Sequence, residues 1–378
     1  MKFYMKKRTK WIVFALFMGI ASLRADMELN PFILFADAFN PHLNMALAVG
    51  GATTSADALA IGGHDPTDNF TIQSIETGFS LLMGETMEGV VNWNFRYDRE
   101  SEWEHELEEG FLKFKALSGG LEFRGGRVLN RFGDRNAKHL HGWNTIDQHL
   151  VNGRFLGDDG LVTDGADLTW YTPGRLNAAL SFSFGQAPAH AHEEEAHDEG
   201  PDSDEIAFDD GFATANLLVQ ANRDDFNQFR FSASLASGDN GLGDDTTIGG
   251  CGVEYVWREH GLEAGGRQVR WMTEAMLRDF GADDPAAEGD EFGFYTDLST
   301  TLVNHMDVGL RIGYVEGVEA FGLEERTRVS PYLTMPVPLP GVQSLQGRLQ
   351  ANFDELAQSG SEQGIWLQVA YALGKGGH

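Results

Sequence analysis

The sequence predicts an all-β protein, a transmembrane antiparallel β-barrel of about 16 strands (roughly 14 to 18) with two long loops. Three observations lead to this fold class. The N-terminus is basic and then apolar, short segments of alternating polarity repeat along the chain, and no later apolar run is long enough for a membrane-spanning helix. A soluble β-sandwich is the alternative, but a sandwich usually has far fewer strands.

Residues 1–25 have the features of a secretory signal peptide. An apolar run, Trp11 to Ala21, follows a basic start and precedes the small residue Ala25. The run of about 11 residues is too short to cross a bilayer, which takes about 20. A buried N-terminal helix is the alternative, although clustered cations rarely precede one. The cations are Lys2, Lys6, Lys7, Arg8 and Lys10. We expect export, cleavage after Ala25, and a single outer-membrane domain over 26–378.

The chain is strongly acidic. It has 28 Lys and Arg residues against 57 Asp and Glu residues, a net charge of −29. Six of the cations and none of the acids precede Asp26, so the chain after Ala25 carries a net charge of −35. Such a surface repels nucleic acid and attracts cations, although solvation explains this acidity as often. The single cysteine, Cys251, permits no internal disulfide and is expected to pack as a small apolar side chain.

The region after the signal peptide consists of alternating segments separated by turns rich in Gly, Asp and Asn. In one of the clearest, Leu349 and Phe353 alternate with Arg348, Gln350 and Asn352. A polar inner face implies a wet lumen rather than a packed one. Strands are expected near 42–49, 70–83, 86–97, 104–117, 119–128, 162–171, 174–185, 211–222, 226–237, 247–258, 264–278, 290–302, 304–315, 324–335, 343–354 and 364–373.

Two segments interrupt this rhythm. Residues 131–160 form a long irregular loop without strand periodicity, and a structureless stretch of this length is often functional. We expect it to fold inward as a constriction or to lie at one mouth. Residues 186–210 form a low-complexity loop of histidines and acids.

The second loop is the first candidate metal site, because imidazole and carboxylate groups suit Zn²⁺. The spacing lacks the helical His-Glu-x-x-His pattern of a rigid zinc enzyme, so we expect weak, reversible binding. A solvated acidic loop that binds nothing specific is equally consistent with the sequence. The candidate ligands are His190, His192, His197, Glu193, Glu194, Glu195 and Asp198.

His139 and His141 form the second candidate metal site. On an extended segment, alternate side chains point the same way, so the two rings could chelate one ion. The simpler interpretation is that they hydrogen-bond and pack the loop, and the sequence favours it.

A group of cations and acids around the first loop is the candidate pore constriction. If they face each other across the lumen, they create a transverse field of the kind that tunes ion selectivity. Structural ion pairs that tie the loop to the wall are the alternative. The cations are Arg124, Arg127, Arg131 and Arg135, and the acids are Glu106, Glu108 and Glu122.

Several motifs in the first half occur in a characteristic order. They are IETGFSL at 75–81, ELEEGFL at 106–112, GGLEFRGGRVLNRFG at 119–133, HLHGW at 139–143 and IDQHLVNGRFLGDDGLVTDGADLTW at 146–170. This order resembles a porin-like family of outer-membrane β-barrels often labelled zinc-regulated TonB-dependent outer membrane receptors. Asp147, Leu150 and Val151 match that family's pattern, whereas His149 stands where a proline is usual. The resemblance implies an outer-membrane protein with a zinc-linked role.

Taken together, these features predict a porin-like channel for small solutes or ions, zinc-linked through the second loop. Its expected partners are outer-membrane lipid and small solutes or divalent cations, with no nucleic acid. It requires no cofactor, and Zn²⁺ is at most a weakly bound ion. The alternative is a metal-capture or TonB-dependent-type receptor without a recognisable plug. An enzyme is disfavoured because no Gly-x-Ser-x-Gly elbow, phosphate loop or paired cysteine site is present. From the net charge we expect a modest preference for cations.

Overall fold

The computed structural model describes residues 42–53, 60–67, 69–98, 102–117, 119–173, 177–188, 206–263, 265–303, 305–338 and 344–373. The expected signal peptide lies outside these residues. So do all the candidate zinc ligands of the second loop, from His190 to Asp198.

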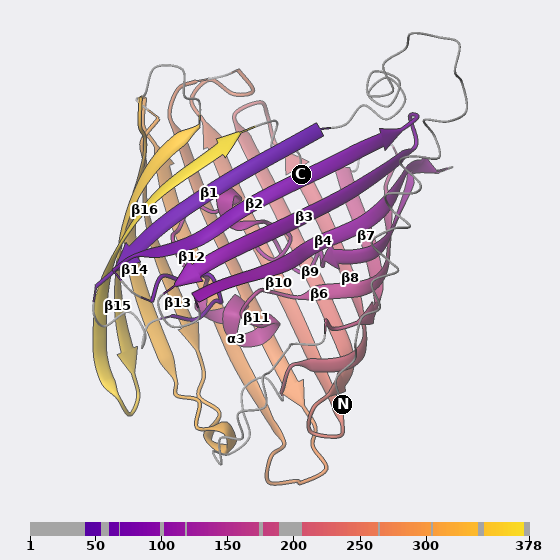
Figure 1. The fold of residues 1–378 in the computed structure, drawn as a ribbon, viewed down its shortest axis with the longest axis vertical. Helices are drawn as coiled ribbons and strands as arrows, with labels where there is room; N and C mark the ends of the chain where they lie inside the picture. Colours follow the sequence, from indigo (N-terminus) through magenta and orange to yellow (C-terminus); the bar gives the residue numbers. More distant parts are fainter. Residues whose placement is uncertain are drawn as a thin grey trace.

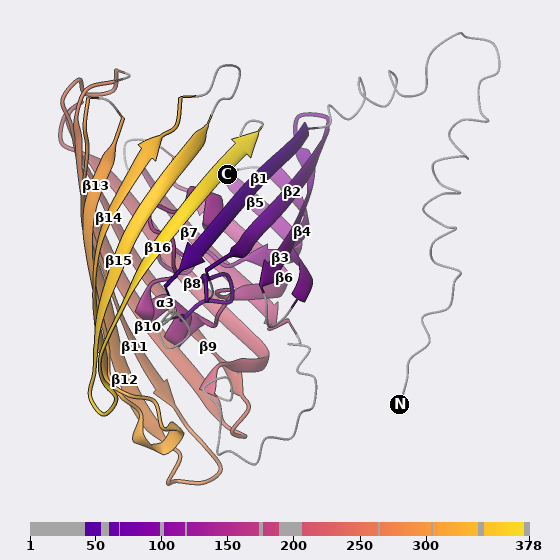
Figure 2. The ribbon, with the colours of Figure 1, turned by 60° about the vertical axis from the view of Figure 1, so that its left-hand side comes forward.

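Sixteen antiparallel strands form one closed barrel in which every strand pairs with its neighbours in sequence (Figures 1 and 2). Closure comes from β1 and β16, which pair from Met45 opposite Leu373 to Ala52 opposite Trp366. The strands are β1 His42–Ala52, β2 Thr71–Met83, β3 Met87–Asp98, β4 Glu102–Leu117, β5 Leu121–Leu129, β6 Val162–Tyr171, β7 Asn177–Gln186, β8 Phe208–Asn222, β9 Asn227–Asn240, β10 Asp245–Arg258, β11 Gln268–Phe280, β12 Gly289–Thr301, β13 Asp307–Val315, β14 Arg326–Pro336, β15 Leu345–Leu356 and β16 Gly360–Leu373.

The predicted fold class and strand number are confirmed, and the differences are at strand ends. The start of β16 is four residues earlier than the expected 364, because a tight turn lets Gly360 pair with Leu356 of β15. The start of β11 is four residues later than the expected 264. There the chain forms a turn in which Arg267 donates its backbone N–H and its guanidinium to Glu259.

Apolar side chains cover the outside of the barrel. Phe184 is 67% exposed and Leu367 61% exposed, whereas their inward-facing counterparts Gln350 and Gln368 are buried. Cys251 also lies exposed on this outer face, in β10. A continuous exposed apolar surface of this kind is not stable in water. Within the described residues, no helix is both long and apolar enough to cross a membrane.

The long loop between β5 and β6 folds into the barrel (Figure 1). Its helix α3, Leu150–Leu156, contacts β11, β12 and β13, and its short 3-10 helix η2, Leu140–Gly142, contacts β1 and β16. The loop therefore contacts two separate parts of the wall. This confirms that 131–160 lies outside the regular wall.

The expectation of a wet rather than packed lumen is wrong for the part beside α3. The side chains of Leu150, Val151 and Phe155 are buried against the wall, where they meet apolar residues such as Ile248 and Met276. The inner face of these strands is not uniformly polar, so an apolar helix can pack against it.

Candidate functional site

A buried carboxylate, Asp147, anchors the inward loop to the wall. Its Oδ1 accepts hydrogen bonds from Arg311 and Gln350, both at 2.6 Å. Its Oδ2 accepts from Arg328 at 2.7 Å and Asn352 at 2.6 Å. Burial alone would raise the pKa of Asp147, but the two guanidinium groups and these hydrogen bonds lower it to about 2. The loop is therefore held by an ionised side chain that is fully paired.

A second contact joins this loop to the chain between β1 and β2. Asp65 accepts the backbone N–H of Gln148 at 2.7 Å and those of Ile61 and Gly62 at 2.9 and 3.0 Å. Residues 60–67 and the loop 131–160 thus pack together inside the barrel and form one assembly.

A cavity of about 340 Å³ lies between this assembly and the inner wall of β9 to β12. Five cations and three carboxylates border it, so fixed charge rather than apolar surface faces the space. The cations are Arg135, Lys138, Arg230, Arg258 and Arg270, and the carboxylates are Asp134, Glu254 and Asp297.

Ion pairs hold most of these side chains in place. Asp134 of the loop pairs with Lys138 and Arg230, and Glu254 pairs with Arg230 at 3.1 Å and Arg270 at 2.5 Å. Arg258 instead donates to the neutral Gln228 at 2.9 Å. The cavity therefore has a net positive lining although the chain as a whole is acidic.

Of the arginines expected at a constriction, three lie in ion pairs on the β5–β6 side of the wall. Arg124 pairs with Asp167 at 2.9 Å, and Arg127 forms a bidentate ion pair with the two carboxylate oxygens of Asp164. Arg131 contacts Glu122 at 2.7 Å, which ties the start of the loop to β5. This geometry favours the structural interpretation for these residues.

Arg135 is the member of the expected set that borders the cavity. Its guanidinium lies over the Trp143 ring at 3.8 Å and donates to Thr145 at 3.1 Å. Arg135 and Lys138 also border a second cavity of about 40 Å³ on the other side of this segment. The two side chains therefore stand between the two spaces.

Glu106 and Glu108, the remaining acids of the expected set, face histidines in and around this second cavity. His139 lies between two carboxylates, with Nδ1 at 3.0 Å from Glu108 and Nε2 at 2.9 Å from Glu109. Burial lowers the pKa of His139, but the hydrogen bonds with the two glutamates outweigh it and raise the pKa well above the usual range. His141 contacts Glu76 at 2.7 Å. Both expected histidines are thus engaged in hydrogen bonds that pack the loop.

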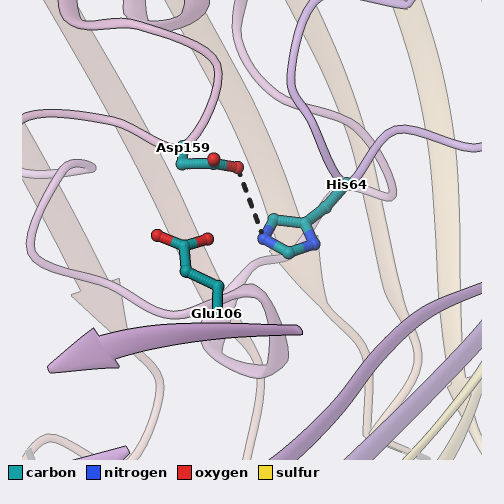
Figure 3. A group of neighbouring side chains, drawn as sticks. All are labelled: His64, Glu106 and Asp159. Carbon is teal, nitrogen blue, oxygen red and sulfur yellow. Dashed lines mark ion pairs between the residues drawn. The ribbon is translucent and has the colours of Figure 1, made fainter. Parts of the chain in front are cut away.

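A histidine that sequence reasoning overlooked lies on the opposite side of Glu108. His64, Glu106 and Asp159 come from three separate segments, and their side chains converge (Figure 3). One ligand atom from each lies within 4.8 Å of the other two. His64 Nε2 is 3.6 Å from Asp159 Oδ1 and 4.0 Å from Glu108 Oε1.

Sequence reasoning also overlooked the cations of the opposite wall. Arg230 sits between Phe229 and Phe231 in β9, so strand alternation alone places it on the inner face. Glu254 can be placed in the same way. No local signal distinguishes His64 or Asp159, because neither lies in a periodic segment.

Comparison with known proteins supports the fold. The structure is similar to an anion-selective porin from Comamonas acidovorans, with a TM-score of 0.57 and 12% identity over 88% of this chain and 99% of the porin. It is also similar to a loop-deletion variant of OmpT, an outer membrane protein of Vibrio cholerae, with a TM-score of 0.56 and 11% identity over 89% of this chain and all of that one. For OprB of Pseudomonas putida the TM-score is 0.55 and the identity 9%, over 90% and 96%.

No protein-family model and no curated protein matches the sequence. The similarity is therefore one of fold, that of the 16-stranded porin-like barrel. A TonB-dependent receptor has about 22 strands around a plug, whereas this barrel has sixteen and is filled by its own loop. The resemblance to the zinc-regulated receptors stays an expectation.

Proposed function

We propose that the protein is a channel for small solutes in a bacterial outer membrane. The closed barrel supports a membrane location, because it leaves no unpaired strand edge and presents an apolar outer surface suited to lipid. The basic and apolar start of the sequence agrees with export. Lipid is then the partner of the outer wall, and small solutes are the partners of the lumen.

The observation that carries the proposal is the charged cavity of about 340 Å³ between the inward loop and the wall. Solutes would pass from this cavity toward the smaller one beyond Arg135 and Lys138. The side chains of Arg135 and Lys138 border both spaces, so we expect changes in their rotamers to open the path. We expect a narrow pore of low conductance.

The lining of the cavity favours small anions. Its five cations outnumber its three carboxylates, and every solute that enters comes within about 8 Å of them, the distance over which charges act at physiological salt. The modest cation preference expected from the net charge stays untested, and the local lining favours the opposite sign. An anion-selective porin is among the similar structures, which agrees with this proposal.

Reversal potentials across planar bilayers under a salt gradient test the proposal. The purified protein is expected to conduct with a preference for anions, and Arg230→Gln combined with Arg258→Gln is expected to reduce or invert that preference. Arg267→Gln is the matched control, because Arg267 lies in an exposed turn paired with Glu259. An unaltered cation preference in all variants would reject the anion assignment, and absence of conductance would reject the channel.

A metal-capture receptor is the second candidate, favoured by the histidines and acids of the loop 186–210. β7 ends at Gln186 and β8 begins at Phe208, and the candidate ligands between these strands lie outside the described residues. Replacing His190, His192 and His197 by Ala is expected to remove weak Zn²⁺ binding that declines below about pH 6.5, where imidazole becomes protonated. Calorimetry on the wild-type protein and the triple variant measures Zn²⁺ binding. Equal binding by the two proteins would mean that the loop is a solvated acidic segment without a specific metal site.

We infer a transport role rather than catalysis. Titratable groups in the lumen, such as Asp134, Asp147 and His139, are engaged in ion pairs that position the loop. The proposed channel requires no cofactor and no nucleic acid.

A further inference from the structure

The group His64, Glu106 and Asp159 borders the smaller cavity, into which the proposed channel leads, and these side chains have no role assigned above (Figure 3). His64 belongs to the chain between β1 and β2, Glu106 to β4, and Asp159 to the end of the inward loop. We propose that these three side chains bind a divalent transition-metal ion that joins the two inner segments to the wall. The inference is independent of whether solutes pass through the barrel.

The orientation of the His64 ring is the first argument. Its Nδ1 lies 2.9 Å from the carbonyl oxygen of Gln73, and a carbonyl can only accept, so Nδ1 carries the hydrogen. In the neutral ring Nε2 then holds a lone pair, and this atom faces the carboxylates. Metal-binding histidines are usually arranged in this way, with the second ring nitrogen donating to a backbone carbonyl or carboxylate.

The distances are the second argument. His64 Nε2 lies 3.6 Å from Asp159 Oδ1, which is beyond hydrogen-bonding distance. Two ligands of a tetrahedral Zn²⁺ site, each about 2.1 Å from the ion, are about 3.4 Å apart. The observed separation therefore suits two ligands of one ion better than a direct hydrogen bond. Asp159 Oδ1 is also buried without a hydrogen-bond donor among the described residues.

His139, which also contacts Glu108, shows a different arrangement of the same residue types, although it too belongs to a group that could hold an ion, with Glu76 and Glu108. Its two ring nitrogens contact Glu108 and Glu109 at 3.0 and 2.9 Å, the geometry of a protonated ring hydrogen-bonded to two carboxylates. His64 makes no such short contact, although Glu108 is a neighbour of both rings.

Charge and space complete the argument. Four carboxylates border this cavity, those of Glu106, Glu108, Asp158 and Asp159, and they outnumber its two cations, Arg135 and Lys138. The nearby Arg96 donates to Glu104 and to the carbonyl oxygen of Gly63. The cavity of about 40 Å³ has room for an ion and a bound water. One imidazole with two carboxylates suits Zn²⁺ or Mn²⁺, because imidazole favours transition metals and carboxylate accepts both.

The test uses the full protein with His190, His192 and His197 replaced by Ala, so that the second loop cannot contribute. After treatment with chelator, this parent is titrated with Zn²⁺ and with Mn²⁺ by calorimetry, and bound metal is counted by mass spectrometry. We expect about one ion per chain. Loss of a residue that only supports a metal ligand lowers metal affinity roughly 10- to 100-fold. His64→Gln removes a direct ligand, so we expect a larger loss of affinity.

His260→Gln is the matched control. His260 lies in the turn after β10, at the end of the barrel opposite Asp159. The substitution is therefore expected to leave the metal affinity unchanged. Asp159→Asn is a second test that removes one ligand charge without changing its size. Circular dichroism and the shifted migration of unheated protein on gels verify that each variant is folded.

Absorption of bound Co²⁺ in the visible range is an independent readout. The intensity of the bands depends on the number of ligands around the ion, and their position changes when the histidine ligand is lost. A parent that binds no ion would overturn the proposal, as would equal affinities of the parent, His64→Gln and Asp159→Asn. Should His64→Gln fail to fold, Asp159→Asn decides alone. Conductance of the parent is measured separately after treatment with chelator, so failure of this site and failure of the channel are distinguishable.

Discussion

Removing the charge of Asp147 is expected to release the inward loop while leaving the barrel closed. Four hydrogen-bond donors converge on this carboxylate, from Arg311, Arg328, Gln350 and Asn352. In Asp147→Asn one oxygen becomes an amide nitrogen that faces donors. The barrel ladder, in contrast, includes no residue of the loop.

The magnitude follows from the geometry and from the pKa. The lowering of the pKa from 3.8 to about 2 corresponds to roughly 2 to 3 kcal/mol in favour of the charged side chain. Breaking a buried ion pair costs about 3 to 5 kcal/mol. Because Arg328 keeps its pair with Asp354, we expect the lower end, about 3 kcal/mol. The population of the released loop should then rise about 100-fold.

Limited trypsin digestion measures this population, because the loop contains Arg131, Arg135, Lys138 and Arg154 whereas paired strands resist cleavage. When opening is fast relative to cleavage, the rate follows the open population, so cleavage within 131–160 should accelerate about 100-fold. Asp225→Asn in an exposed turn is the control. Equal cleavage of Asp147→Asn and wild type would refute the anchoring role.

The pH dependence has a definite sign. The pKa of Asp147 in the folded protein is below its ordinary value, so the stabilisation is complete above about pH 4 and is lost as the pH falls toward about 2. Pepsin, which works in this range, should cleave the wild-type loop increasingly between these values. Asp147→Asn should already be susceptible at pH 4.

Three further perturbations probe the wall and the packed side of the lumen. Leu367→Lys on the outer face is expected to destabilise the barrel in lipid vesicles by about 2 to 4 kcal/mol if it lies near the bilayer midplane, and an unchanged folding equilibrium would argue against a lipid-facing wall. Gly126→Ala should lower the yield of folded barrel, because Gly126 has a φ of 131° and its added Cβ would lie 2.2 Å from the carbonyl oxygen of Gly110. Gly249→Ala, with no atom within 4 Å of the added Cβ, should leave the yield unchanged. Phe155→Ala removes a buried ring of α3 at a cost of about 3 to 5 kcal/mol, and the trypsin assay should then report a released loop.

Some features of the site were predictable because they depend on strand periodicity. Arg230 and Glu254 alternate with apolar residues, and a side chain between two outward-facing neighbours must face inward. The inward position of the loop 131–160 was one of two expected outcomes. The loop interrupts the strand pattern in sequence, but that interruption does not specify whether it lies in the lumen or at a mouth.

The partners of the lumenal side chains could not be predicted in the same way. From their charges, Arg124 and Glu106 were both predicted to lie at one constriction. In the structure Arg124 pairs with Asp167 on the adjacent strand, and Glu106 faces His64. Cross-strand register decides the first pairing and loop packing the second. Neither is encoded in local spacing.

The sequence by itself determined a closed barrel of about 16 strands and its two faces. Alternation with a period of two separates an apolar surface from a polar one, and backbone hydrogen bonding in lipid leaves only a closed sheet as a solution. Only the tertiary structure decided what the lumen contains. Asp147 meets Arg328, and Asp159 meets His64, because an irregular loop folds across the barrel and is held by contacts between segments distant in sequence. Such contacts depend on the three-dimensional path of the loop, and no periodic pattern in the chain records that path.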